Sequence, residues 1–252
     1  MPTDAETGPD TPVATTTPAP ERAAWWEDFL DIFYAPSQVF ERRRDSGFLV
    51  PLVVLVTVAV TLVLIGRPVL QPVYDSEMVR GLTVAARSNP NITPERIEQM
   101  RSVNAKLLPV YAGFGTLLAP LVVGLVLWAA ARAVEARITV AAACMVATFA
   151  FFPRLLEGLL NIVQGYVLDP ATLDSHYRLT LGPARFFGAD TTSPIVLALL
   201  GRLDVFTIWV TVLLAIGLSV VARIPRARAA AAAVLVYIAG ALPSILQAVR
   251  SS

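Results

Sequence analysis

Five long apolar stretches constrain the fold of this 252-residue chain more than any other feature. They lie at residues 48–66, 107–131, 138–160, 203–222 and 229–248, and arginine, proline or a polar loop ends each of them. The hydrocarbon core of a bilayer is about 30 Å thick and requires about 20 apolar residues per helix. The stretches therefore predict an all-α membrane protein, a polytopic bundle of five transmembrane helices.

The composition favours such a bundle over a soluble domain or a barrel. Hydrophobic residues make up 56% of the chain and charged residues 15%, with a mean hydropathy of +0.64, which is too apolar for an ordinary soluble domain. The apolar runs are continuous, whereas the strands of a membrane barrel alternate over about ten residues. Every basic residue except Lys106 is arginine, which indicates a GC-rich coding genome and therefore a bacterium.

Composition divides the chain into three parts. Residues 1–22 are Pro/Thr-rich and acidic without an apolar run, which predicts a disordered cytoplasmic tail. Residues 23–46 carry amphipathic patterns, and residues 47–250 hold the five apolar stretches. We therefore expect a tail, N-terminal amphipathic helices at the membrane surface, and a five-helix transmembrane domain.

The amphipathic part begins with a predicted surface helix. Its apolar side chains recur at helical spacing and its acids lie largely opposite: the first face holds Trp26, Phe29, Leu30 and Phe33, and the second Glu27, Asp28 and Asp31. A helix of this kind lies in the interface with its rings at headgroup depth. After Pro36, which ends the helix, a second short helix presents Val39 and Phe40 inward. The predicted membrane-surface anchors are Trp25, Trp26, Phe29, Phe33, Pro36 and Phe40.

Arginine density predicts the orientation in the membrane. Residues 42–44 are three consecutive arginines at the entrance of the first span, and the short connections 132–137 and 223–228 carry two and three arginines. The long loop 67–106 mixes its basic residues with acids. Short basic loops stay in the cytoplasm. This distribution predicts a cytoplasmic N-terminus and a C-terminus outside.

The loop 67–106 contains a helix start. Thr93 is a capping residue, Pro94 suits the first helical position, and Glu95 places an acid near the positive helix end. We expect this helix to lie on the outer surface and to continue into the second span. In that span Ala112, Thr116 and Gly124 share a face of small residues, either for packing within the bundle or for a homodimer contact.

Two charged residues follow a proline in the third span. Arg154 and Glu157 come directly after Pro153, about one turn apart, so they are placed to form a local ion pair. Charges inside a span are costly and are candidates for function. The pair lies near the end of the span, so it either extends to the interface or makes a polar contact inside the bundle.

Asp204 stands at the start of the fourth span. Ser193 and Pro194 begin a short apolar helix that ends at Gly201, and Asp204 then occupies a capping position. The alternative is a carboxylate that binds a proton or a cation and faces Arg154.

Enzyme signatures are absent from the sequence. It contains no Gly-x-Ser-x-Gly, no His-Glu-x-x-His, no glycine-rich phosphate loop, and no Cys or His pair with metal spacing. The single histidine, His176, is expected in a solvated loop, and the single cysteine, Cys144, is expected to be a small packing residue. The sequence therefore predicts a protein that is not an enzyme and has no cofactor, metal or nucleic-acid partner.

Several segments occur in an order that resembles a known family. Residues 33–40 read Phe-Tyr-Ala-Pro-Ser-Gln-Val-Phe, the third span contains a proline, and residues 203–209 read Leu-Asp-Val-Phe-Thr-Ile-Trp, with Gly217 following. This order resembles the bacterial branch of the Yip (Ypt-interacting protein) family, five-span membrane proteins. The eukaryotic relatives act in vesicle trafficking with Rab-type GTPases, a role that does not transfer to bacteria.

The resemblance covers residues 24–248 and implies a cytoplasmic N-terminus with a short C-terminus outside. It also implies that Asp204, Phe206 and Trp209 shape the entrance of the fourth span, and that residues 36–40 dock the N-terminal region.

Two hypotheses for function follow. The first is a non-enzymatic integral protein of the bacterial cytoplasmic membrane, an organiser or scaffold that contacts the lipid bilayer and binds a membrane protein partner or forms a homo-oligomer. The second is a small transporter or channel component with a polar path near Arg154, Glu157 and Asp204. Internal repeats, which many transporters show, are not visible in the sequence and argue against the second. No small-molecule substrate is evident.

Overall fold

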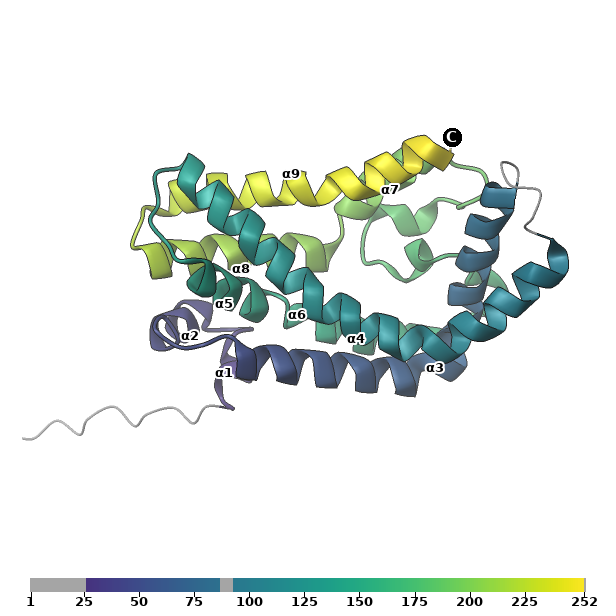
Figure 1. The fold of residues 1–252 in the computed structure, drawn as a ribbon, viewed down its shortest axis with the longest axis horizontal. Helices are drawn as coiled ribbons and strands as arrows, with labels where there is room; N and C mark the ends of the chain where they lie inside the picture. The colour runs from purple at the N-terminus through teal and green to yellow at the C-terminus, as the bar shows by residue number, and fades with distance from the viewer. Residues whose placement is uncertain (1–25, 87–92, 252) are drawn as a thin grey trace, which may run out of the picture.

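The described part of the fold is all-helical. The structure is a computed structural model that describes residues 26–86 and 93–251 (Figure 1), so the predicted tail 1–22 and Trp25 lie outside the described residues. Within them there is no β-strand. The α-helices are α1 (Asp28–Asp31), α2 (Pro36–Arg42), α3 (Leu49–Ala86), α4 (Pro94–Ala133), α5 (Val140–Ala150), α6 (Pro153–Val167), α7 (Pro194–Arg202), α8 (Val205–Ala222) and α9 (Arg226–Ser251).

Five segments of the structure are long and apolar enough to cross a membrane. They are Leu49–Ala86, Pro94–Ala133, Val140–Val167, Val205–Ala222 and Arg226–Val249. Each overlaps most of one of the five predicted apolar stretches. The predicted class is confirmed: the chain is an all-α, multi-pass membrane protein.

The first two spans are longer than predicted. Helix α3 continues 20 residues beyond the expected end at residue 66, through Pro68 and Pro72, so most of the predicted loop 67–106 is helical. A proline inside a helix removes one backbone hydrogen bond, but Leu70 and Val73 of this extension pack on Ile162 of α6, which offsets the loss. The helix start at Thr93 is confirmed, because its side chain accepts a hydrogen bond from the Arg96 amide at 3.3 Å.

The third span consists of two helices instead of one. Helix α5 ends at Ala150 and α6 begins at Pro153, inside the stretch 138–160 that the apolar pattern predicts to be one span. Proline has no N–H and its ring collides with the preceding helical turn, whereas the first position of a helix tolerates it. The break starts a new helix at Pro153 and so sets the direction of the side chains that follow.

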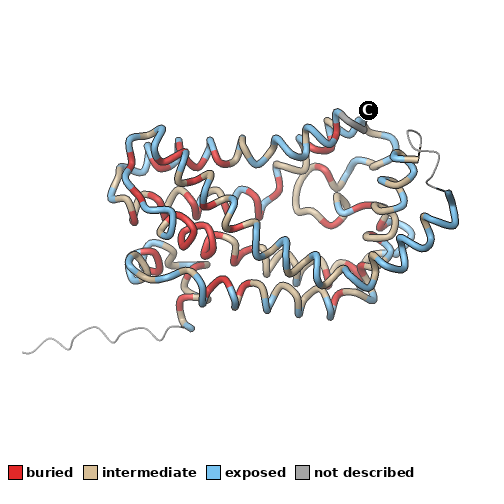
Figure 2. The backbone as a smooth tube through the Cα atoms, in the orientation of Figure 1, coloured by how far each residue is buried: buried red, intermediate tan, exposed pale blue. Residues whose placement is uncertain are grey.

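Helices α5 and α8 form the centre of the bundle, with α3, α4 and α9 around them. Buried residues concentrate near α5, whereas most residues of α3, α4 and α9 are exposed or intermediate (Figure 2). The largest cluster of buried side chains contains Leu127 of α4, Met145 and Phe149 of α5, and Leu213 and Leu218 of α8. The outer helices therefore expose apolar side chains, as helices surrounded by lipid do.

The face of small residues on α4 packs within the bundle at one position. A Cβ on Gly124 would lie 2.7 Å from the Cα of Cys144, whereas a Cβ on Gly115 would meet nothing within 4 Å. Cys144 is buried at this contact. Gly124 thus lets α4 approach α5 closely, and Gly115 lies on an open part of the same helix.

This difference gives a prediction with a built-in control. We expect Gly124→Ala to destabilise the protein by about 1–3 kcal/mol, because the new methyl group meets backbone that cannot move aside. Gly115→Ala is expected to be neutral or slightly stabilising. Thermal unfolding of the detergent-solubilised variants measures both. Equal melting temperatures for the two variants would contradict the close approach at Gly124.

Candidate functional site

Three ionisable side chains named in the sequence analysis meet where α6 and α8 begin. Arg154 Nη1 lies 2.6 Å from Glu157 Oε2 and 3.8 Å from Asp204 Oδ1, and Arg154 Nη2 donates to Thr207 Oγ1 at 2.8 Å. The sequence allows the Arg154–Glu157 pair either to extend to the interface or to make a polar contact inside the bundle. In the structure the pair contacts α8 within the bundle. Pro153 places Arg154 in the first turn of α6, from which the guanidinium reaches α8.

Asp204 is buried and acts as the N-cap of α8. Its side chain is 3% exposed, and Oδ1 accepts hydrogen bonds from the amides of Phe206 at 2.9 Å and Thr207 at 3.2 Å. The other oxygen, Oδ2, accepts from the Leu181 amide at 3.0 Å. Asp204 therefore caps α8 as predicted and also lies 3.8 Å from Arg154, while the binding of a proton or a cation by this carboxylate stays a prediction.

The third hydrogen bond of Asp204 attaches a distant loop to the bundle. Leu181 lies in the connection between α6 and α7, and a Cβ on the neighbouring Gly182 would lie 2.8 Å from the Leu203 carbonyl oxygen. Glycine is therefore required for this close approach. Sequence reasoning did not find Leu181 or Thr207, because a backbone amide and a span threonine have no signal in the pattern of charges.

The cluster is suited to holding helices together. Both Asp204 oxygens accept hydrogen bonds from backbone amides, one at the N-terminus of α8 and the other in the loop at Leu181. No group of three or more His, Cys, Asp or Glu side chains placed to hold a metal occurs among the described residues. The cluster's charges and hydrogen bonds connect α6, α8 and the loop at Leu181. We call this cluster, which consists of Arg154, Glu157, Asp204 and Thr207, the junction.

Removing the guanidinium tests the junction. We expect Arg154→Leu to destabilise the protein by about 2–4 kcal/mol, because it leaves the Asp204 and Glu157 carboxylates without their cation in a buried setting. Arg154→Lys is expected to recover part of the loss, since one ammonium cannot reach Glu157 and Thr207 together. Thermal unfolding in detergent is the measurement. A silent Arg154→Leu variant would mean that the side chain instead extends to the interface.

A second polar cluster joins the N-terminal helices. Asp28 is buried and contacts both Arg42, with Nε to Oδ1 at 2.8 Å, and Arg43. The predicted exposure of Asp28 on an acidic face is wrong. Helix α1 has only four residues and the chain turns back at once into α2, so the arginines of α2 cover the acid instead of water.

The arginines at 42–44 are thus engaged with the protein and are not free at the membrane entrance. Arg44 Nη2 donates to the Val221 carbonyl oxygen near the end of α8 at 2.7 Å. Hydrogen bonds from Tyr34 and Arg42 lower the pKa of the Asp31 carboxyl. The contribution of Asp31 is therefore present at neutral pH and lost only as the pH falls through its lowered pKa.

The N-terminal segment, which consists of α1, α2 and the turn between them, packs on the bundle through aromatic rings. Phe29 stacks on Phe152 with centroids 5.1 Å apart, and Phe33 meets the edge of Trp209 at 5.7 Å. Phe40 is fully buried beside Phe149. Of the predicted membrane-surface anchors, Phe29, Phe33 and Phe40 therefore contact helices, while Pro36 begins α2. Amphipathic periodicity shows that a face is covered by apolar groups, but it does not distinguish lipid from protein.

A comparison with protein families identifies the domain. The model of the Yip1 domain matches residues 30–246, which include every helix from α2 to α8 and most of α9. The chain belongs to the Yip1 domain family. Comparisons with curated proteins and with solved structures give no match.

The motif residues of this Yip1 domain chain contact one another in the fold. Asp204 caps α8, and Phe206 stacks on Trp209 with centroids 6.3 Å apart. A Cβ on Gly217 would lie 2.5 Å from Val146 Cγ1 and 3.0 Å from the Phe40 ring. The residues that carry the sequence resemblance are therefore part of the packing between the N-terminal segment, α5 and α8.

The opposite end of the Yip1 domain is held by several polar contacts. Arg80 Nε lies 2.8 Å from Asp190, and Arg101 lies 2.7 Å from Asp75 between α3 and α4. His176 lies in the loop between α6 and α7 with an exposed side chain, as the sequence predicts, and in addition its amide donates to Glu77 at 2.8 Å and its ring contacts that carboxylate. These contacts connect the loops to the extended part of α3.

Proposed function

We propose that this Yip1 domain chain is a non-enzymatic protein of the bacterial cytoplasmic membrane that organises the membrane or binds a protein partner there. The composition supports a bacterial source, since all basic residues except Lys106 are arginine. The charged groups at the start of α6 and α8 bond to other parts of the fold, which supports a structural role for them. We further propose that the end of the bundle carrying α1 and α2 faces the cytoplasm and that the C-terminus lies outside.

The observation that carries this proposal is the two-sided N-terminal segment. Its inner side, with Phe29 and Phe33, packs on the bundle. Its outer side exposes large side chains at helical spacing: Trp26 is 53% exposed, Leu30 57% and Tyr34 74%. An apolar face held rigidly at the end of the spans is suited to contact with a partner protein or the headgroup region.

The test is extraction of the tagged protein into lipid nanodiscs, followed by mass spectrometry of the proteins that remain bound. We expect a stoichiometric partner that is lost from the Trp26→Ser/Leu30→Ser double variant. Phe186→Ser is the control, because Phe186 is 79% exposed in the loop at the opposite end. Recovery of the chain alone, or of a homo-oligomer that both variants retain, would count against the role of the outer face.

The fold also gives one observation in favour of a transporter. Arg154, Glu157 and Asp204 come together between α6 and α8, as residues of a coupled transport site would. Glu157→Gln changes the charge of this cluster and leaves the cap of α8 in place. The test is a flux assay on the purified protein in liposomes. If the wild type carried a pH-dependent flux that Glu157→Gln removed without unfolding the protein, the transporter hypothesis would be favoured over the organiser hypothesis.

A further inference from the structure

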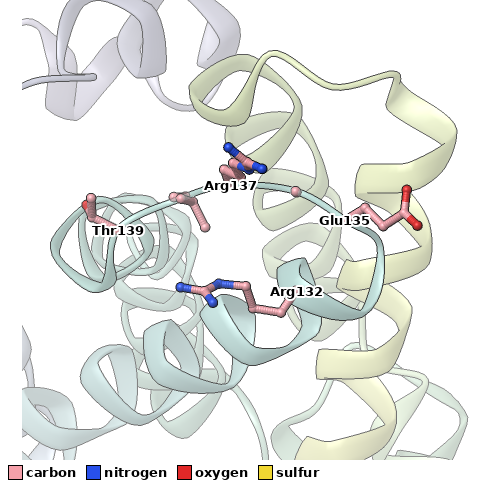
Figure 3. A pocket seen from close by; sticks show the side chains of 6 residues that line it. Arg132, Glu135, Arg137 and Thr139 are labelled. Carbon is pink, nitrogen blue, oxygen red and sulfur yellow. The ribbon is translucent and has the colours of Figure 1, made fainter.

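A basic pocket opens at the end of the bundle that carries α1 and α2. It lies in the connection between α4 and α5 and has a volume of about 850 Å³ (Figure 3). The residues that line it are Arg132, Glu135, Ala136, Arg137, Ile138 and Thr139. The pocket is separate from the junction at Asp204, which lies at the other end of α8.

The turn between α4 and α5 brings the two arginines to one pocket. Glu135 has a left-handed backbone with φ of 58°, and the Ala136 amide donates back to the Ala131 carbonyl oxygen at 2.8 Å. This hydrogen bond closes the end of α4 and reverses the chain. As a result Arg132, at the last turn of α4, and Arg137, after the reversal, line the same space.

The acidic residue of the pocket is directed away from it. Glu135 extends toward α9 in Figure 3, where its carboxylate lies 3.7 Å from Arg228 Nη1. Arg228 also donates to the Val134 carbonyl oxygen at 3.3 Å, so the turn that begins α9 lies beside the pocket. That turn also carries Arg223 and Arg226. The local charge is therefore strongly positive, with the carboxylate of Glu135 facing Arg228.

The surroundings match the boundary of a membrane. The Arg132 guanidinium lies 4.8 Å from the centre of the Trp128 ring, and tryptophan favours the level of the lipid headgroups. The pocket also adjoins the first turn of α5, an 11-residue helix that Thr139 caps by accepting from the Ala142 amide. The positive end of a helix adds to the attraction of an anion by two guanidinium groups.

We propose that this pocket binds the phosphate of an anionic phospholipid headgroup. Arginine forms paired hydrogen bonds to phosphate oxygens, and the exposed apolar side chains Val122 and Leu125, on the turns of α4 that precede Trp128, provide a path for the acyl chains. Basic pockets between spans attract anionic lipids in this way. The proposal requires only that this end of the bundle lies at a membrane surface, and it does not depend on the partner-binding role.

The test compares lipid binding by native mass spectrometry of the full chain in mixtures of phosphatidylglycerol and phosphatidylcholine. We expect the wild type to retain phosphatidylglycerol over phosphatidylcholine with about tenfold preference, and Arg132→Gln/Arg137→Gln to retain the two lipids about equally. Arg137→Gln alone, which disrupts none of the ion pairs described above, is expected to give an intermediate loss. The control is Arg96→Gln/Lys106→Gln, which removes the same charge from exposed positions of α4 far from the pocket.

Three results would overturn the proposal. The first is a wild type with no preference for phosphatidylglycerol, and the second is an equal loss in the control, which would indicate general charge attraction. The third separates the two sources of phosphate: if inorganic phosphate alone binds in an Arg132- and Arg137-dependent manner, with no lipid preference, the pocket serves a soluble anion. Melting temperatures of all variants establish that they are folded.

Discussion

Asp204→Ala is expected to lower the free energy of unfolding by about 3–5 kcal/mol, the usual cost of removing one partner from a buried charged pair. The substitution removes the acceptor of the Phe206, Thr207 and Leu181 amides. It also leaves the Arg154 guanidinium without one of its carboxylates. Because the loop at Leu181 loses one of its attachments to the bundle, we expect this loop to become more sensitive to protease as well. Thermal unfolding and limited proteolysis in detergent measure the two effects.

Asparagine at this position separates the cap from the other contacts. Asparagine caps a helix as well as aspartate does, so a simple cap would tolerate Asp204→Asn. In this fold the second oxygen accepts from Leu181, and an amide NH₂ there would face another donor. We therefore expect Asp204→Asn to cost about 1–3 kcal/mol.

Asp190→Ala serves as the control for both Asp204 variants. Asp190 forms an exposed ion pair with Arg80, so its replacement is expected to cost less than about 1 kcal/mol. If Asp204→Ala had the same small effect as Asp190→Ala, the junction would not be important for stability.

Phe40→Ala is expected to cost about 3–5 kcal/mol, the range found when a buried aromatic side chain is truncated. The Phe40 ring is fully buried, meets the edge of Phe149 and fills the space that Gly217 leaves free. Its loss removes a fully buried contact of α2 with α5 and α8. We therefore expect trypsin to cleave at the arginines of residues 42–44 before the spans unfold.

The matched control for Phe40 is Tyr34→Ala in the same segment. The Tyr34 side chain is exposed and bonds only to Asp31 among the contacts described, so we expect a change below about 1 kcal/mol and no new cleavage. Release of the segment by Tyr34→Ala, or an unchanged cleavage pattern in Phe40→Ala, would contradict the docking of α2 through Phe40.

Local signals predicted some details of the helices and missed others. Thr93 and Asp204 were both recognised as caps, because capping depends on a side chain and on amides within three residues of it. The helical extension of α3 beyond residue 66 was missed, since Pro68 and Pro72 indicate a loop when they are considered without their neighbours. Packing on Ile162, which is about 90 positions away in sequence, supports helix there.

The burial and the partners of the charged side chains were the least predictable part of the site. Helical periodicity placed Asp28 opposite the apolar face, yet the structure buries it beneath Arg42 and Arg43. The pairing depends on the turn between α1 and α2, which brings residues about 14 positions apart together. Likewise, the sequence uses Arg132 and Arg137 only to predict the orientation of the chain in the membrane. The chain reversal at Glu135 is what places both arginines around one pocket.

The sequence by itself determined that five helices cross a membrane and that the chain resembles the Yip family, because span length, hydropathy and short motifs are local properties of the chain. Only the tertiary structure decided that the aromatic N-terminal segment packs on α5 and α8, that Asp204 ties Leu181 and Arg154 together, and that a basic pocket forms beside α9. The first two arrangements join groups that are far apart in sequence and depend on how the helices pack, and the pocket depends on the backbone reversal at Glu135 and on the packing of α9 beside it.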